Sequence, residues 1–248
     1  MSDFNRGAGP VLQGAEADVD VGLRRFMLGV YNKMALGLLL SAVLAYATSS
    51  FGPVADLFYN LTPDGRLRGL TIYGMALQFA PLVVLVITMF TMRNPTARGA
   101  SFLYWTIVTL IGAGAGIWLL MYTGASIVMA FLITSSAFGA LSLAGYMVKR
   151  DLSGLHSFLI MGVWVVLAAS LVSMFIPIPG SNMIINIAAG VIFAGLVATQ
   201  TQMLKMTYYD VQGDHERMSA VTSLGALNLY ISFMNLFQIL LSFIGVRR

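Results

Sequence analysis

The chain contains no cysteine, and charged residues make up only 10% of its 248 residues. The lack of cysteine excludes disulfides, thiol chemistry and cysteine-ligated metal centres. The lack of charge, beside 58% hydrophobic residues, excludes an ordinary soluble domain, in which about a quarter of the residues are charged. A chain of this composition has to place most of its surface in lipid.

Acidic residues are also missing from the middle of every long apolar stretch. Hydrocarbon about 30 Å thick needs about 20 apolar residues of helix to cross it. Seven stretches meet this requirement, at residues 26–50, 70–91, 101–121, 126–147, 156–175, 182–204 and 224–244. A membrane β-barrel would instead show short segments of alternating polarity. We therefore predict an all-α polytopic membrane protein, a seven-transmembrane-helix bundle.

The first 25 residues differ from the rest of the chain. They are rich in glycine and acid and lack the apolar core of a cleavable signal peptide. We expect residues 1–25 to form a disordered cytoplasmic tail, followed by one transmembrane domain over residues 26–246.

Basic residues divide unequally between the two sides of the predicted bundle. If the N-terminus is cytoplasmic, the cytoplasmic side holds ten of them: Arg6, Arg24, Arg25, Lys33, Arg93, Arg98, Lys149, Arg150, Lys205 and Arg217. The outer side holds Arg66, Arg68, Arg247 and Arg248. This division follows the positive-inside rule and explains the net charge of +4 without a nucleic-acid partner. Six spans and one re-entrant segment, which would bring the two C-terminal arginines inside, remain an alternative.

Each class of intramembrane enzyme needs polar residues that these spans lack. A serine protease needs a base beside its nucleophile, yet both histidines, His156 and His215, lie at or outside span ends. An aspartyl protease needs two carboxylates within the membrane, and a zinc enzyme needs clustered histidines or carboxylates. A retinal protein needs a lysine in the last span, which has none. We therefore expect no enzymatic activity, no cofactor and no metal site.

The polar side chains left within the spans are neutral. Asn228, Ser232 and Asn235 stand at i, i+4 and i+7 and so share one face of the last span. Because lipid tolerates such a face poorly, we expect it to point into the bundle and the last span to be central. These side chains either bridge helices, at about 1 kcal/mol or less each, or line a water-accessible path. Both roles can hold together.

Small residues in the third and fourth spans indicate close helix packing. Gly112 and Gly116 have the small-xxx-small spacing, and Gly139 lies in a run of small residues in the fourth span. Small side chains let helix backbones approach each other where lipid offers no hydrophobic driving force. We interpret these glycines as packing positions.

Several motifs resemble those of the Bax inhibitor-1 (transmembrane Bax inhibitor motif) family and occur along the chain in the family's order. FLITSSAFGALSLAGYMVKRDLS at 131–153, followed by SFL at 157–159, is similar to the family's fourth span and the loop after it. LNLYISFMNLF at 227–237, closing with FIG at 243–245, is similar to its last span. YNKM at 31–34 and residues 198–205 fit the same register.

The resemblance implies a seven-helix bundle with the last helix at its centre, in a bacterial inner membrane. It also implies a pH-sensitive calcium leak gated by two aspartates, one in the sixth span and one in the seventh. Gln200 and Ser232 stand at those positions here. An amide and a hydroxyl do not titrate near neutral pH, and they offer a divalent cation only neutral oxygens. We expect the fold to carry over and the pH gate not to.

Two functions follow from this comparison. One is a leak for calcium or another cation whose gate has become insensitive to pH. The other is a non-conducting regulator that acts through membrane protein partners, such as a quality-control protease.

Overall fold

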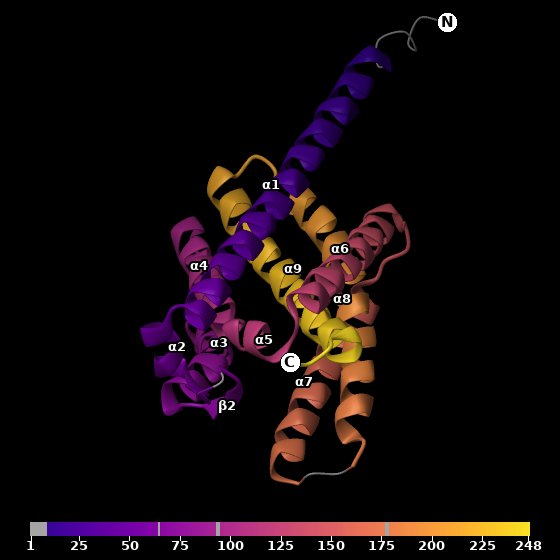
Figure 1. Cartoon of the computed structure of the whole chain (residues 1–248). Helices are drawn as coiled ribbons and strands as arrows, with labels where there is room; N and C mark the ends of the chain where they lie inside the picture. The colour runs from indigo at the N-terminus through magenta and orange to yellow at the C-terminus, as the bar shows by residue number, and fades with distance from the viewer. Residues whose placement is uncertain (1–8, 64, 93–94, 177–178) are drawn as a thin grey trace, which may run out of the picture.

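The computed structural model describes residues 9–63, 65–92, 95–176 and 179–248 (Figure 1). The elements of this described part are α1 (Gly9–Ser50), α2 (Gly52–Phe58), β1 (Tyr59–Leu61), β2 (Leu67–Leu70), α3 (Ile72–Thr91), α4 (Ala97–Gly114), α5 (Gly116–Met121), α6 (Gly124–Met147), α7 (Ser153–Phe175), α8 (Ser181–Val211) and α9 (His215–Ile244). Helices account for all the long elements, because the long apolar runs can satisfy their backbone groups internally only as helices. The prediction of an all-α membrane protein is confirmed.

Seven segments of the described chain are long and apolar enough to cross a membrane. Each overlaps one predicted span, and α4 and α5 together form the third, Ala97–Met121. This span is interrupted at Ala115, whose N–H donates to Gly112 O as well as to Ile111 O. The connection between the first two spans contains α2 and a small antiparallel hairpin of β1 and β2.

The first helix begins before the predicted boundary at residue 26. Helix α1 starts at Gly9, so residues 9–25 of the predicted tail are helical, and Leu23 is 1% exposed. The tail is therefore shorter than predicted at this end, since Leu23 already belongs to the packed core. Residues 1–8 lie outside the described residues, and disorder there stays a prediction.

The connection between the last two spans is also shorter than the sequence indicates. Helix α8 continues to Val211 and α9 starts at His215, whereas the predicted spans end at residue 204 and start at residue 224. Asp214 caps α9 by accepting a hydrogen bond from Arg217 N at 3.0 Å, and Gly213 supplies a positive φ of 92° for the turn. The polar residues here continue the helices beyond the apolar region.

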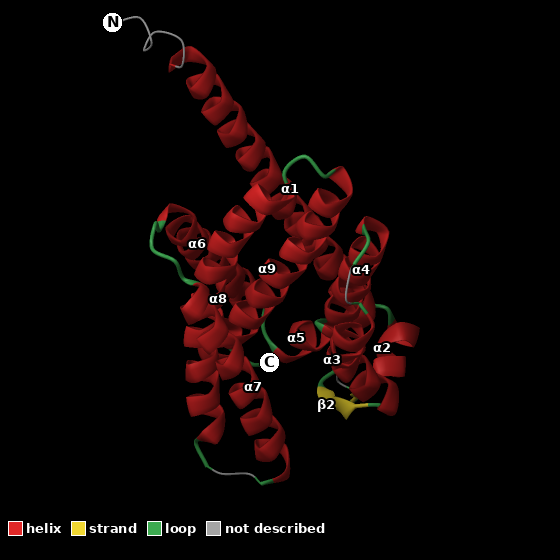
Figure 2. Ribbon diagram, turned by 180° about the vertical axis from the view of Figure 1, so that it is seen from behind, coloured by secondary structure: helices red, strands yellow, loops and turns green. Residues whose placement is uncertain are grey.

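Helix α9 lies at the centre of the bundle, as predicted for the last span. It packs against α1, α4, α6 and α8, and 56% of its most apolar window is buried. Helix α7 packs chiefly against α8, and only 6% of its apolar stretch is buried. Viewed from behind, α9 runs between α8 and α4 (Figure 2).

The C-terminal segment turns back onto the connection between α5 and α6. Thr123 N donates to Val246 O at 3.0 Å, and Arg248 N donates to Met121 O at 3.0 Å. The chain therefore ends beside the start of α6, at the opposite end of the bundle from the connection that follows α6. This arrangement agrees with seven crossings rather than six and a re-entrant segment.

The glycines singled out by sequence have different surroundings. A Cβ at Gly112 would lie 2.6 Å from Ser41 Cα, and one at Gly116 would lie 2.3 Å from Thr48 Oγ1, so α1 approaches the third span closely at both positions. Gly139 has no atom within 4 Å of its Cβ position and makes no close helix contact. The close contact on α6 lies at Gly145 instead, where a Cβ would stand 2.1 Å from Ala198 O of α8.

Candidate functional site

Gln200 of α8 and Ser232 of α9 meet where the two helices pack together. Ser232 Oγ donates a hydrogen bond to Gln200 Oε1 at 3.0 Å. Ser232 is 1% exposed, and Gln200 is half-buried. The structure thus brings together the two positions that the family resemblance assigns to the gate, joined by a neutral hydrogen bond.

The other two candidate pore residues on α9, Asn228 and Asn235, are less buried than Ser232. Asn235 is half-buried, and its Nδ2 donates to Ile231 O of its own helix at 2.8 Å. Asn228 is exposed. The expectation that all three polar residues of this face point into the bundle is therefore wrong for Asn228. Helices α1, α4, α6 and α8 cover the rest of α9 but leave one edge of it open.

This open edge carries a row of polar side chains. We define the polar stripe as Asn228, Asn235, Gln238 and Ser242, which follow each other at helical spacing and are exposed or half-buried. Asn186 of α8 reaches its far end and donates to Ser242 Oγ at 3.4 Å. The Gln200–Ser232 contact adjoins the stripe near its middle. Sequence periodicity found the shared face but not its exposure.

Gln202, two residues beyond Gln200, has a different role. Its Nε2 donates to Val148 O at 3.0 Å and to Arg150 O at 2.8 Å, and its Oε1 accepts from Leu152 N at 2.8 Å. The amide thus holds the connection between α6 and α7 against α8. In that connection, hydrogen bonds from the hydroxyl and the N–H of Ser153 lower the pKa of Asp151 below its ordinary value.

Lys33 makes polar contacts within the bundle, although the sequence indicated only a basic residue on the cytoplasmic side. Its Nζ donates to Ser101 Oγ of α4 at 3.0 Å and to Ser223 Oγ of α9 at 2.7 Å. The only signal for it was its place in the YNKM motif. The same motif holds Tyr31, whose hydroxyl bonds Ser142 Oγ of α6.

In the described part of the chain, every buried side-chain nitrogen or oxygen has a hydrogen-bond partner. No group of three or more histidine, aspartate or glutamate residues lies close enough there to hold a metal ion. Gln200, Ser232 and the residues of the polar stripe are neutral side chains. They can bridge helices or contact water, and they carry no charge to bind a cation tightly.

The fold and these contacts define a seven-helix membrane protein built around its last helix. Residues 23–248 match the protein family described as inhibitor of apoptosis-promoting Bax1. The chain therefore belongs to the Bax inhibitor-1 family.

Three similar proteins come from bacteria. The chain is 53% identical over its whole length to an uncharacterized protein of Caulobacter vibrioides, which it also covers completely. It is 38% identical to an uncharacterized protein of Rickettsia prowazekii, over 92% of each chain. It is 33% identical to the inner membrane protein YbhL of Escherichia coli, over 92% of this chain and 94% of the relative.

Proposed function

We propose that this protein is a weak cation leak of a bacterial inner membrane, for calcium or another cation, with a gate that does not sense pH. The observation that supports this function is the polar stripe. Asn228 and Gln238 are exposed and Asn235 is only half-buried, although all three stand in a membrane-spanning segment. Amides facing hydrocarbon are costly, and a water-filled path along α9 would hydrate them.

The contact between Gln200 and Ser232 is the gate in this proposal. Their hydrogen bond holds α8 against α9 beside the stripe, and opening it would widen the path. Neither group titrates near neutral pH. Asp151 does not substitute for them, because its lowered pKa keeps it ionised throughout the neutral range. Flux should therefore be weak, since neutral oxygens bind calcium poorly, and nearly flat between about pH 6 and 8.

We further propose that the N-terminus is cytoplasmic and the C-terminus is on the outer side. The positive-inside rule supports this orientation. Lys149 and Arg150 lie in the connection after α6, and Arg217 lies in the first turn of α9 at the same end of the bundle. Arg247 and Arg248 return to the start of α6 at the other end.

The second candidate function is a non-conducting regulator of membrane protein partners. The same stripe supports it, because a transmembrane helix of a partner, such as a quality-control protease, would satisfy the amides by interhelical hydrogen bonds. The two functions differ in what covers the stripe: water in the leak, protein in the regulator.

The absence of cysteine allows a direct test of this difference. Single cysteines at Asn228 and Asn235 should react with a membrane-impermeant thiol reagent if the stripe is wet, because the reagent attacks only a hydrated thiolate. Val165, 68% exposed in the middle of α7, is the lipid-facing control and should stay unreactive. Cysteines at His215 and Val246 should react from the cytoplasmic and the outer side, respectively. Unreactive cysteines at both stripe positions would contradict the leak, and reversed labelling of the ends would contradict the orientation.

Replacing the neutral gate by two carboxylates tests the mechanism. In vesicles loaded with a calcium dye, the unmodified protein should give a flat pH profile. Gln200→Asp with Ser232→Asp should give a flux that changes between pH 6 and 8, because burial and mutual repulsion raise the pKa values of both acids. For the same reason, thermal stability of this variant should fall as pH rises, since folding then disfavours the ionised form.

The matched control is Gln200→Asn with Ser232→Asn, which introduces side chains of similar size that cannot titrate. Its flux and stability should stay flat over the same range. A strong, pH-dependent flux in the unmodified protein would show that the sensor lies elsewhere. If neither the unmodified protein nor the double-aspartate variant conducts, the regulator becomes the better account.

A further inference from the structure

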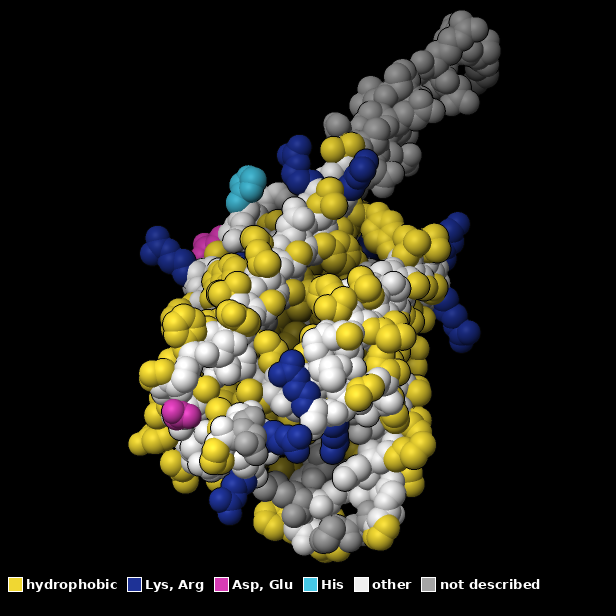
Figure 3. Space-filling model, viewed as in Figure 1, with side chains coloured by type: hydrophobic (Ala, Val, Ile, Leu, Met, Phe, Trp, Pro, Cys, Tyr) yellow, Lys and Arg dark blue, Asp and Glu magenta, His cyan; other side chains and the backbone are white. Residues whose placement is uncertain are grey.

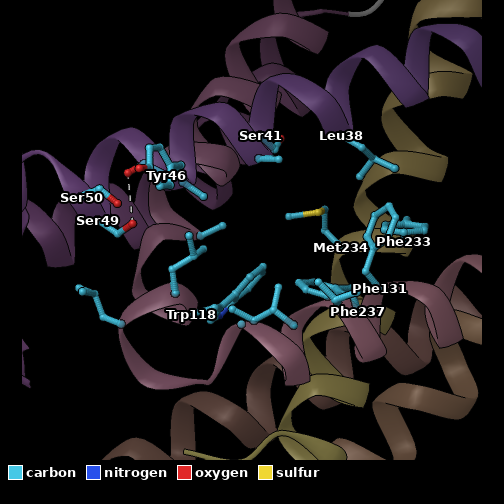
Figure 4. A pocket seen from close by; sticks show the side chains of 18 of the residues that line it. Leu38, Ser41, Tyr46, Ser49, Ser50, Trp118, Phe131, Phe233, Met234 and Phe237 are labelled. Atoms are coloured by element: carbon cyan, nitrogen blue, oxygen red, sulfur yellow. Dashed lines mark hydrogen bonds between the residues drawn. The ribbon is translucent and has the colours of Figure 1, made fainter. Parts of the chain in front are cut away.

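A cavity of about 600 Å³ lies on the other side of α9, between α1, α5 and α6. Most of its lining is apolar and includes Leu38, Ala42, Trp118, Phe131, Met234 and Phe237. Figure 4 shows these helices contributing side chains around an open centre. Ligand sites in proteins have volumes of about 300–1,000 Å³, so the cavity is large enough for part of an organic molecule.

The cavity exists because α1 and α6 both lean on α9 but separate from each other along its outer half. Toward the other end of the bundle, the hydrogen bond between Tyr31 and Ser142 joins the two helices. In the outer half, edge-to-face ring contacts hold α6 and α5 against α9. Phe131 lies 5.7 Å from Phe233, and Trp118 lies 5.5 Å from Phe237, between ring centroids. Figure 3 shows the resulting hollow, with hydrophobic side chains around it.

Water is a poor occupant of this space. A stable buried water needs two to four polar partners. Two of the hydroxyls on the α1 wall are already engaged, Ser41 Oγ with Tyr230 OH at 2.6 Å and Ser49 Oγ with Tyr46 O at 3.2 Å, and most of the remaining lining is apolar. An apolar chain fits the lining better.

One charged side chain, that of Arg248, lines the cavity. Its backbone is fixed by the hydrogen bond from Arg248 N to Met121 O, and the preceding segment by one from Val246 N to Ser126 Oγ at 2.9 Å. No acidic side chain lines the cavity, and the salt bridge found among the described residues joins Arg217 to Asp214. A cation at the mouth of an apolar slot complements an anionic headgroup with its chain inside.

We propose that this cavity binds one acyl chain of an anionic glycerophospholipid whose phosphate contacts Arg248 at the rim. The lipid would come from the leaflet on the C-terminal side. This proposal does not depend on ion conduction, because the cavity and the polar stripe lie on different faces of α9.

The test is photo-crosslinking of the full chain in phosphatidylcholine vesicles. A phosphatidylglycerol probe with a photoactivatable acyl chain is compared with the phosphatidylcholine probe of the same chain, and cross-linked peptides are mapped by mass spectrometry. We expect the cavity segments of α1, α6 and α9 to be labelled about fivefold more by the anionic probe, the effect of one arginine at a membrane surface. Arg248→Gln should abolish this preference. Arg247→Gln should keep it, because Arg247, whose backbone forms a β-bridge with Tyr122, does not line the cavity.

Filling the cavity gives a second, independent comparison. Gly124 lines the cavity, and its Cβ position has no atom within 4 Å, so Gly124→Trp adds a ring without a backbone clash. Gly139→Trp is the matched control on the same helix, equally free of neighbours but lining a separate cavity. Labelling of the first cavity should fall in the former variant and persist in the latter.

Equal labelling by both probes would mean that only annular lipid is detected, and the proposal would be wrong. Labelling that survives Gly124→Trp would also overturn it. Thermal unfolding verifies that each variant is folded. Should the tryptophan variant fail to fold, the two arginine variants alone decide the outcome.

Discussion

The two faces of α9 differ in chemistry although they belong to the same turns of one helix. Tyr230, Phe233 and Phe237 point toward α1, α4 and α6 and are 0%, 3% and 8% exposed. Asn228, Asn235 and Gln238 occupy the edge that no neighbouring helix covers. The aromatic face holds the bundle together and borders an apolar cavity. The amide face contributes little packing, and exposing its amides to hydrocarbon is costly. Water or a partner protein that hydrogen-bonds the amides would remove this cost.

We expect the largest difference in stability between alanine variants of Phe233 and Asn235, which are two residues apart on opposite faces of α9. Phe233 lies 5.5 Å from Phe138 and 5.7 Å from Phe131 between ring centroids, so Phe233→Ala leaves a cavity beside these two rings. We expect it to lower the free energy of unfolding in micelles by about 3 kcal/mol. Asn235→Ala should change it by about 0.5 kcal/mol, because the Asn235 amide bonds only its own helix.

Equal losses in these two variants would break the comparison. They would mean that the amide edge also carries packing contacts, as it would if a second protein remained bound to it during purification. Repeating the measurement after gel filtration to a single species distinguishes packing contacts within the chain from contacts with a bound second protein.

Much of this fold could be predicted from the sequence, because hydrocarbon imposes a length and a composition on each crossing. The spans follow from apolar runs, the central last helix from its polar face and the family resemblance, and the pairing of positions 200 and 232 from that resemblance alone. The exposure of Asn228 could not be predicted in this way. Periodicity tells which residues share a face, but coverage of that face depends on how α4 and α8 diverge around α9.

The glycines show the same limit. Gly139 and Gly145 stand in one run of small residues on α6, and nothing in that run distinguishes them. Only the crossing of α6 over α8 decides that a Cβ at Gly145 would meet Ala198 O whereas one at Gly139 would meet nothing. Likewise, the polar residues near 210–217 suggested a loop, but the Asp214 cap lets both helices continue.

The smallest effect expected distinguishes the two glutamines of α8, Gln200 on the polar edge and Gln202 at the connection after α6. Gln202→Ala removes three hydrogen bonds to the backbone of residues 148–152, and we expect it to lower the free energy of unfolding by about 1.5 kcal/mol, since water replaces part of what is lost. Gln200→Ala removes only the bond from Ser232 and should lower it by about 0.5 kcal/mol. Calcium flux in vesicles should show the reverse order, because only Gln200 closes the proposed gate. A flux that responds to Gln202→Ala and not to Gln200→Ala would place the gate at the connection between α6 and α7, away from the contact of α8 with α9.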